Sequence, residues 1–330
     1  MTVSSLKLRL KKIFSPRRVA IGFILLLMAI FLSAPDAYLP SVQNGLNLYV
    51  VSVLPSMLPF FFFSKLLTEL NFAQSSGKLL KKPLRFLFNA PPVSGYILLM
   101  SMLCGYPVGA KLVGEFFDSG VLSKEEAKKV ASFTSTSGPL FIVGAVGVGM
   151  FGDKKIGFIL LLSHYIGTFL NGLVFRGKKL DEKPSLVPLS NADDILNKSM
   201  LNTFLSVGLV GGYITVFNLF IDVCTNVGLI PLLVNGMEWL NVDGKITSGV
   251  AGGLLEMTKG CLTLSKSGFP HLVILPLCEF LITFGGLCVT LQSLTFLSKT
   301  KISPAYYFLT KFTQGILCSL ICFLLCLTIF

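Results

Sequence analysis

The sequence predicts an all-α polytopic membrane protein made of two inverted repeats, each with a re-entrant helical hairpin and a broken transmembrane helix. The first observation is composition. Mean hydropathy is +0.77 and 13% of the residues are charged, against about 25% in ordinary soluble domains. The second is that apolar segments of membrane-spanning length, about 20 residues, recur along the chain. The third is that two of these segments are interrupted at corresponding places, by Gly105–Gly109 and by Glu256.

The apolar segments set the expected domain organisation. A weaker apolar stretch at 227–240 contains Pro231 and Glu238, so it either lies at the membrane interface or spans the membrane. The expected units are a basic N-terminal segment with the first helix, a first repeat, a polar cytoplasmic linker and a second repeat, at 1–45, 46–176, 177–198 and 199–330. The apolar segments lie at 19–34, 46–68, 94–117, 130–152, 156–176, 199–222, 246–264, 271–298 and 304–329.

The N-terminus resembles a secretory signal, because a basic start precedes an apolar run at 19–33. Pro35 and Asp36 follow where a small-residue cleavage site would stand. We therefore expect an uncleaved first helix.

Weak internal similarity indicates the repeat. In one register Gly138 corresponds to Gly285 and His164 to Lys311, and the stretches beginning SGYILLM and SGVAGGLL also correspond. Each repeat then crosses the membrane an odd number of times, so the two copies must have opposite orientations. Inverted repeats with paired interrupted helices are typical of secondary-transporter cores.

Charge placement predicts the topology. Basic residues and no acidic residue precede position 19, and basic loops favour the cytoplasmic side. With the N-terminus in the cytoplasm, the basic stretches 76–91 and 177–183 also lie there. The net charge of +12 gathers in such clusters rather than on a basic helix interleaved with aromatic residues. The expected partner of these charges is the lipid bilayer, not nucleic acid.

The stretch LCGYPVGAKLVG at 103–114 predicts the first hairpin, which we place at 94–117. Pro107 lacks a backbone N–H, and Gly105 and Gly109 loosen the backbone, so a helix breaks there. Broken backbone inside a bilayer is tolerated only where protein or water satisfies its polar groups. The hairpin is therefore expected to lie in a protein-lined cavity.

The candidates for substrate binding in this stretch are Gly105, Tyr106, Pro107, Gly109 and Lys111. Lys111 would offer a cation to an anionic substrate, and Tyr106 would stack on a flat ring. The alternative for Lys111 is a side chain that extends to the cytoplasmic surface.

The second hairpin is expected at 246–264, where Glu256, Thr258 and Lys259 interrupt an apolar segment. On a continuous helix Glu256 and Lys259 would share a face and form an ion pair. Such a pair either neutralises two costly charges or opens when substrate or a proton arrives. Both interpretations stay open.

The stretch SFTSTSGP at 132–139 predicts an unwound joint within a helix. A half-helix starting near Pro139 would direct free N–H groups toward the hydroxyls, which makes an anion site. The alternative is that the hydroxyls bond to their own helix backbone. Candidate binding residues are Thr134, Ser135, Thr136, Ser137 and Gly138, and Glu279 in the corresponding part of the second repeat.

Three residues are candidates for coupling transport to an ion or proton: His164, Glu256 and Lys311. His164 and Lys311 lie in otherwise apolar helices. A histidine that titrates near neutral pH can relay protons. The alternative is that both are hydrogen-bonded packing groups.

Enzymatic activity is not expected. The two histidines are far apart, and no metalloprotease, serine-hydrolase or Walker-type motif is present. The eight cysteines lie almost entirely in apolar segments without a C-x-x-C spacing. We expect buried thiols, no metal site and no cofactor.

Several stretches resemble the family of sporulation integral membrane proteins called YlbJ or SpoVV: SGYILLMSMLCGYPVGAKL, SFTSTSGPLFIVGAVGVGMFG and SHYIGTFLNG. This family is part of the group with a nucleoside-recognition (Gate) domain, which is similar to concentrative nucleoside transporters. The resemblance covers roughly 46–330 and is most specific over 94–176. Gly138 departs from the Asn expected before the proline, which puts a side-chain amide contact there in doubt.

The resemblance implies a function in spore formation. Members are implicated in moving dipicolinic acid (pyridine-2,6-dicarboxylate) across the outer forespore membrane, where they are placed from the mother cell. The residues alone indicate only a transporter with a polar, cation-bearing site near the middle of the membrane. That site is compatible with a small anionic aromatic substrate.

Two other functions remain open. The first is transport of a nucleoside or another small metabolite, in which Glu256 and Glu279 would bond ribose hydroxyls or hold a cation. The second is a non-transporting membrane scaffold that recruits partners through the basic stretches 76–91 and 177–183. A homo-oligomer and other sporulation membrane proteins are further candidate partners.

Overall fold

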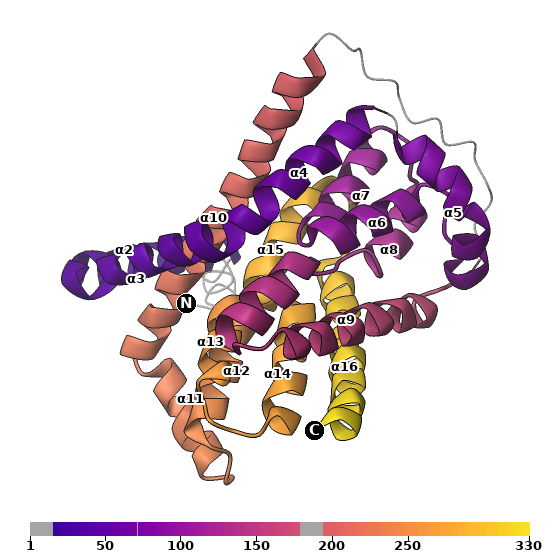
Figure 1. The fold of residues 1–330 in the computed structure, drawn as a ribbon. Helices are drawn as coiled ribbons and strands as arrows, with labels where there is room; N and C mark the ends of the chain where they lie inside the picture. Colours follow the sequence, from indigo (N-terminus) through magenta and orange to yellow (C-terminus); the bar gives the residue numbers. More distant parts are fainter. Residues whose placement is uncertain (1–15, 71, 179–193) are drawn as a thin grey trace, which may run out of the picture.

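A computed structural model describes residues 16–70, 72–178 and 194–330 of the chain. Within these ranges the protein is helical and has no β-strand, so the predicted all-α class is confirmed (Figure 1). Most of the predicted linker and the basic segment before residue 16 lie outside the described residues.

The first half of the chain forms α2 (Pro16–Ser33), α3 (Pro35–Leu48), the π-helical η1 (Tyr49–Val53), α4 (Leu54–Glu69), α5 (Phe72–Phe88), α6 (Ser94–Cys104), α7 (Val108–Asp118), α8 (Lys124–Ala131), the π-helical η2 (Leu140–Met150) and α9 (Lys154–Val174). The second half forms α10 (Ile195–Asn226), α11 (Leu229–Glu238), α12 (Gly244–Leu255), α13 (Met257–Ser265), α14 (His271–Phe284), α15 (Gly286–Leu297), the short η4 (Ser298–Thr300) and α16 (Pro304–Ile329).

The chain is a multi-pass membrane protein by the length and composition of its helices. Large apolar side chains stay exposed along α4, α9, α10 and α16, as a surface in contact with lipid requires. Five helical stretches of the described residues are long and apolar enough to cross a membrane: Pro35–Glu69, Lys154–Val174, Ile195–Asn226, His271–Thr300 and Pro304–Ile329.

Two pairs of short helices replace continuous helices where the sequence predicts interruptions. Helix α6 ends before Gly105, whose φ is +82°, and α7 begins after Pro107, which has no backbone N–H to donate. Helix α12 ends before Glu256, whose backbone is extended, and α13 begins directly after it. In each pair the two helices pack against one another.

Two further helices are broken in the middle. Residues 135–138, between α8 and η2, have no regular structure, and they form the unwound joint predicted from the hydroxyl-rich stretch. Between α14 and α15 the break is a single residue, Gly285, with φ of +79°. A left-handed conformation of this kind favours glycine.

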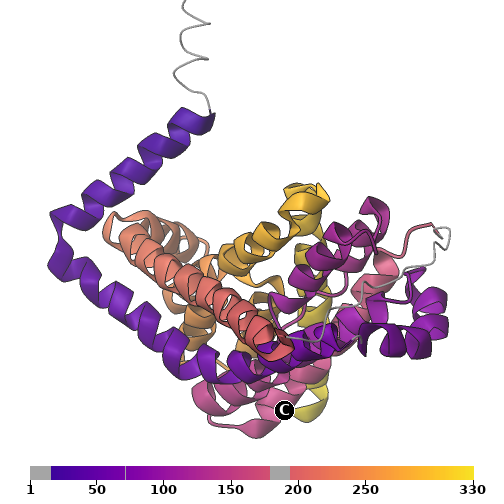
Figure 2. The same cartoon turned by 90° about the horizontal axis from the view of Figure 1, so that it is seen from above.

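The longest helix, α10, forms one side of the molecule. Helices α3 and α4 pack against it, and Figure 2 shows this layer with α2 leading away from it at a sharp bend. The bend falls at Ala34, between α2 and the proline that starts α3.

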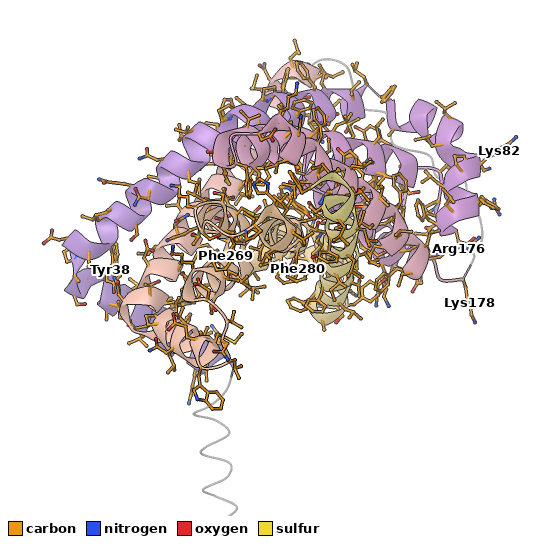
Figure 3. The ribbon with its side chains drawn as sticks, turned by 60° about the horizontal axis from the view of Figure 1, so that its bottom comes forward. Tyr38, Lys82, Arg176, Lys178, Phe269 and Phe280 are labelled. Atoms are coloured by element: carbon orange, nitrogen blue, oxygen red, sulfur yellow. The ribbon has the colours of Figure 1, made fainter. Side chains whose placement is uncertain are left out.

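Helices α9, α14 and α16 pack together on the other side. Small residues permit this, since a Cβ on Gly167 would lie 2.3 Å from Cys318 Sγ and one on Gly315 would lie 2.9 Å from Phe280. Phe280 is half-buried and its ring packs against Phe312 of α16 (Figure 3). Cys318, Cys322 and their neighbour Cys326 are fully buried, which confirms the prediction of buried thiols for this helix face.

The weak apolar stretch 227–240 forms α11, which has 10 residues. A helix of that length is about 15 Å long, half of the bilayer core, so α11 does not span it. Leu229, Leu232 and Leu233 are exposed while Ile230 is buried, and Trp239, just after the helix, is 84% exposed. Trp in this position is typical of the membrane interface.

Candidate binding site at the helix interruptions

A small cavity lies where the helix interruptions meet. It is lined by Gly105 and Tyr106 between α6 and α7, by Ser137 and Gly138 of the unwound joint, and by Glu256 between α12 and α13. Its volume is about 40 Å³, which is room for only a few water molecules. Helices η1, α4, α6, η2, α10, α13 and α15 complete the wall with Val53, Ser56, Met57, Leu103, Cys104, Leu140, Phe141, Val210, Ile214, Met257, Thr258, Cys288, Val289 and Gln292.

The break between α6 and α7 and the unwound joint approach each other through glycines. A Cβ on Gly105 would lie 2.5 Å from the backbone nitrogen of Gly138, and one on Gly109 would lie 1.6 Å from the carbonyl oxygen of Thr134. A Cβ on Gly138 would lie 3.2 Å from the carbonyl group of Cys104. These glycines therefore serve close backbone packing, and an Asn at 138 would have to displace Cys104.

Lys311 is the buried cation of this region. Its ammonium group donates to the hydroxyl of Tyr106 at 2.8 Å, to the carbonyl oxygen of Ser135 at 2.8 Å and to Gln314 Oε1 at 3.0 Å. The Tyr106 hydroxyl in turn donates to the carbonyl oxygen of Thr283 at 2.7 Å. Lys311 thus holds the hairpin tip and the joint against α16.

His164 forms a second buried network on the other face of the joint. Its Nε2 accepts the backbone N–H of Ser137 at 2.9 Å. Its Nδ1 lies 3.1 Å from Glu279 Oε1 and 2.9 Å from Thr283 Oγ1. Glu279 is fully buried and does not line the cavity, and its Oε2 has no hydrogen-bond partner among the described residues. The network therefore reaches the cavity through Ser137.

The predicted hydroxyl residues of the joint are buried, and three of them bond within the protein. Thr134 Oγ1 donates to the carbonyl oxygen of Val130 at 2.8 Å, Ser135 bonds to Tyr307 at 2.8 Å and Thr136 bonds to Ser101 at 2.8 Å. Only Ser137 and Gly138 of the five candidates line the cavity. Thr134 therefore follows the alternative prediction, in which a hydroxyl bonds to the backbone of its own helix.

Glu256 does not pair with the Lys259 side chain. Its carboxylate accepts the backbone N–H groups of Thr258 at 3.0 Å and of Lys259 at 2.8 Å, and so caps the start of α13. The Lys259 ammonium group instead donates to Asp222 on α10. The predicted ion pair assumed a continuous helix, but the helix breaks at Glu256, so the three-residue spacing no longer places the two side chains on one face.

Lys111 lies outside the cavity, contrary to expectation. Its ammonium group donates to Ser206 Oγ on α10 at 2.7 Å and lies 3.9 Å from Glu115. Lys65 on α4 also contacts Glu115, at 3.4 Å. The break ends at Pro107, so Lys111 sits one turn into α7 on the face toward α4 and α10. The side chain is 12% exposed, so it does not extend to the surface either.

Sequence reasoning missed several residues of the site. Gln292 lines the cavity and Gln314 bonds to Lys311. Both are polar residues within apolar helices, which is the signal that would have found them. The apolar wall from α4 and α10 carries no such signal.

His164, Glu279 and Cys318 present a nitrogen, a carboxylate oxygen and a sulfur within 4.8 Å of one another. Such donors suit a transition metal. The bond from Ser137 N–H to Nε2, however, leaves the ring proton on Nδ1, the atom that faces Glu279. In this arrangement both ring nitrogens of His164 are engaged in hydrogen bonds.

The ends of α5 and α9 form a basic edge of the molecule. Lys82, Arg176 and Lys178 lie there (Figure 3). Arg176 donates to the carbonyl oxygen of Phe86 at 2.7 Å, and Lys129 donates to that of Lys178 at 2.6 Å. Burial lowers the pKa of the Lys129 ammonium group. Residues 177 and 178, the part of the stretch 177–183 that the structure describes, thus meet the stretch 76–91 at one edge.

Comparison with known proteins identifies the family. No protein-family model matches the chain, and no solved structure matches it. The sporulation integral membrane protein YlbJ of Bacillus subtilis (strain 168) is 30% identical over 322 aligned residues, which cover 89% of this chain and 79% of that protein. The chain therefore belongs to the family of the sporulation integral membrane protein YlbJ.

Proposed function

We propose that the protein is a transporter of a small anionic aromatic substrate, dipicolinic acid, across the outer forespore membrane. The observation that supports this most is that both short helix pairs and the unwound joint contribute their breaks to one small cavity. In secondary transporters, substrate sites lie near the middle of the membrane between interrupted helices of inverted repeats.

We assign the repeats as follows. Helices α4, α6–α7, α8–η2 and α9 correspond to α10, α12–α13, α14–α15 and α16. In this assignment the α6–α7 and α12–α13 pairs are re-entrant hairpins that enter from opposite sides. The breaks at Gly138 and Gly285, and the side chains of His164 and Lys311, then occupy equivalent positions.

The cavity suits an anion because of the helix starts around it. Helices α7 and η2 start after the N-cap residues Pro107 and Pro139, which have no side-chain cap bond, next to Tyr106 and Gly138 of the cavity wall. Uncapped N-termini offer N–H groups and a positive dipole to carboxylates. Tyr106 offers an aromatic face at the wall, and Lys311 lies directly behind it, 4.7 Å from the ring centre.

The cavity is too small for this substrate in this conformation. A volume of about 40 Å³ cannot hold a pyridine ring with two carboxylates, so the hairpins have to move against α10 to admit it. Two polar ties hold them in place, from Lys111 to Ser206 and from Lys259 to Asp222. We propose that these ties loosen in turn as access alternates.

The ends of α5 and α9 form one basic edge, which supports the assignment of the basic stretches 76–91 and 177–183 to the same side of the membrane. We propose that this side is the cytoplasm of the mother cell, together with the N-terminus, following the preference of basic segments.

A nucleoside is the second candidate substrate. The Glu256 carboxylate lines the cavity, and a carboxylate repels an anion but accepts hydrogen bonds from ribose hydroxyls. This observation favours a neutral, hydroxyl-bearing substrate over an anionic one.

Counterflow in proteoliposomes that contain only this protein tests the proposal. Vesicles loaded with unlabelled pyridine-2,6-dicarboxylate are expected to take up the labelled compound, and uridine is not expected to compete. Tyr106→Ala should abolish exchange, because it removes the aromatic wall and the hydroxyl bonded to Lys311. Tyr213→Ala is the matched control, since Tyr213 on α10 is half-buried, bonds to Thr295 on α15 and does not line the cavity.

The outcomes separate the three functions. Exchange of uridine instead of the dicarboxylate would show that the protein is a nucleoside transporter with the proposed repeat architecture. Absence of exchange for both compounds, with folded protein in the vesicles, would favour the scaffold role.

A further inference from the structure

One hydrogen bond between Ser137 and His164 determines where the protons of the buried network lie. The backbone N–H of Ser137 donates to His164 Nε2 at 2.9 Å. A backbone amide only donates, so Nε2 presents its lone pair, and the neutral ring carries its proton on Nδ1. That N–H points at Glu279 Oε1 and Thr283 Oγ1, 3.1 Å and 2.9 Å away.

A proton that binds to His164 therefore competes with Ser137. The only free lone pair of the ring is on Nε2, and an imidazolium ring is a donor at both nitrogens. Two N–H groups would then face each other, so the bond from Ser137 has to break. Ser137 belongs to the unwound joint and lines the cavity.

We propose that His164 couples transport to protons by exchanging the Ser137 N–H for a proton. This inference rests on the proposed function and names its driving ion. The incoming proton bonds to Nε2, the Ser137 N–H to Nε2 bond breaks, and the released N–H donates to a carboxylate oxygen of the substrate in the cavity. When the substrate leaves, the proton leaves Nε2 and the original bond re-forms. Anion and proton therefore bind together.

The groups that face His164 are arranged for this exchange. On α14, Glu279 places a carboxylate beside Nδ1, and this carboxylate compensates an imidazolium charge in a buried site. On α16, Cys318 donates to the His164 carbonyl oxygen at 3.4 Å. Lys311, also on α16, bonds to Tyr106 and to the carbonyl oxygen of Ser135, two residues before Ser137.

Proton counting tests the exchange directly. Binding of pyridine-2,6-dicarboxylate to purified protein near neutral pH is measured by calorimetry in buffers of different ionisation enthalpy. The native protein is expected to take up protons from the buffer as it binds. His164→Gln keeps an acceptor for the Ser137 N–H but cannot be protonated, so it should bind without proton uptake. The other histidine of the chain, His271, supplies the matched control His271→Gln, which should behave as the native protein.

A second variant covers the case in which His164→Gln does not fold. Glu279→Gln keeps an acceptor for Nδ1–H but removes the charge that compensates the imidazolium, so proton uptake on binding should fall. Binding by the native protein without proton uptake would overturn the exchange, and so would unchanged uptake in both variants.

Vesicle transport separates this inference from the function on which it rests. An imposed inward proton gradient should raise net uptake by the native protein and not by His164→Gln. Counterflow together with net uptake that does not change with the proton gradient would overturn the coupling by His164 but not the proposed transport function. Absence of counterflow would overturn both.

Discussion

The ammonium group of Lys311 and the hydroxyl of Tyr106 are hydrogen-bonded at 2.8 Å, although 205 residues separate them in the chain. The bond joins α16 to the tip between α6 and α7, at the wall of the cavity. Both side chains are buried, so water cannot replace either partner. Several consequences of this arrangement and of its surroundings are measurable.

Lys311→Met should destabilise the protein by about 1–3 kcal/mol, the cost of leaving buried polar groups without partners. The carbonyl oxygen of Ser135 would keep only Gln314, at 3.2 Å. Thermal unfolding in detergent measures the effect as a lower midpoint. Lys299→Met is the control, because its ion pair with Asp118 is exposed and should contribute little. Equal midpoints for the two variants would contradict the role of Lys311.

Lys111→Met should leave dicarboxylate affinity within about threefold of the native value, below the 1.4 kcal/mol that a tenfold change represents. Lys111 bonds to Ser206 outside the cavity, whereas Lys311 lies behind its wall. Lys311→Met should abolish detectable binding. Titration calorimetry compares the two variants. A larger loss of dicarboxylate affinity in Lys111→Met than in Lys311→Met would indicate that the substrate binds at Lys111 on α7.

Glu256→Ala should cost about 0.5–2 kcal/mol of stability, the usual value of a helix N-cap. The carboxylate accepts two backbone N–H groups at the start of α13. Glu256→Gln keeps one acceptor and removes the charge, so it should lose less stability and bind the dicarboxylate more tightly. Chemical unfolding and calorimetry on both variants check this. Unchanged or weaker dicarboxylate binding by Glu256→Gln would contradict the expectation that the Glu256 charge opposes the substrate.

Gly109→Ala should prevent normal folding, because its Cβ would lie 1.6 Å from the carbonyl oxygen of Thr134. That oxygen belongs to the backbone of Thr134, directly before the unwound joint, so it cannot move unless the joint separates from α7. Gly252→Ala, in open space within α12, should be neutral or stabilise the protein by up to about 1 kcal/mol. Yield of monodisperse protein after extraction distinguishes them, and a normal yield for Gly109→Ala would show that the joint can shift.

The positions of the helix breaks were predictable because they follow from local chemistry. Pro107 lacks a donor, and Gly105 adopts a φ that other residues avoid. Five hydroxyl residues before Gly138-Pro139 likewise indicated the unwound joint. Each of these signals acts over a few residues, so it is visible in the sequence.

Side-chain partners were not predictable in the same way. Lys259 was expected to meet Glu256 but bonds to Asp222, and Lys111 was expected in the cavity but bonds to Ser206. In both cases the direction of the side chain depends on where the helix restarts after its break. A displacement of one turn moves a flexible ammonium group to a different neighbour.

The sequence by itself determined that this chain is a multi-helix membrane protein with interrupted helices, because hydropathy, glycine and proline act locally. Only the tertiary structure decided which polar groups share the cavity and which of the lysines is buried behind it. These choices depend on backbones that approach within contact distance across more than a hundred residues, where glycine clearance and hydrogen-bond direction leave a single arrangement.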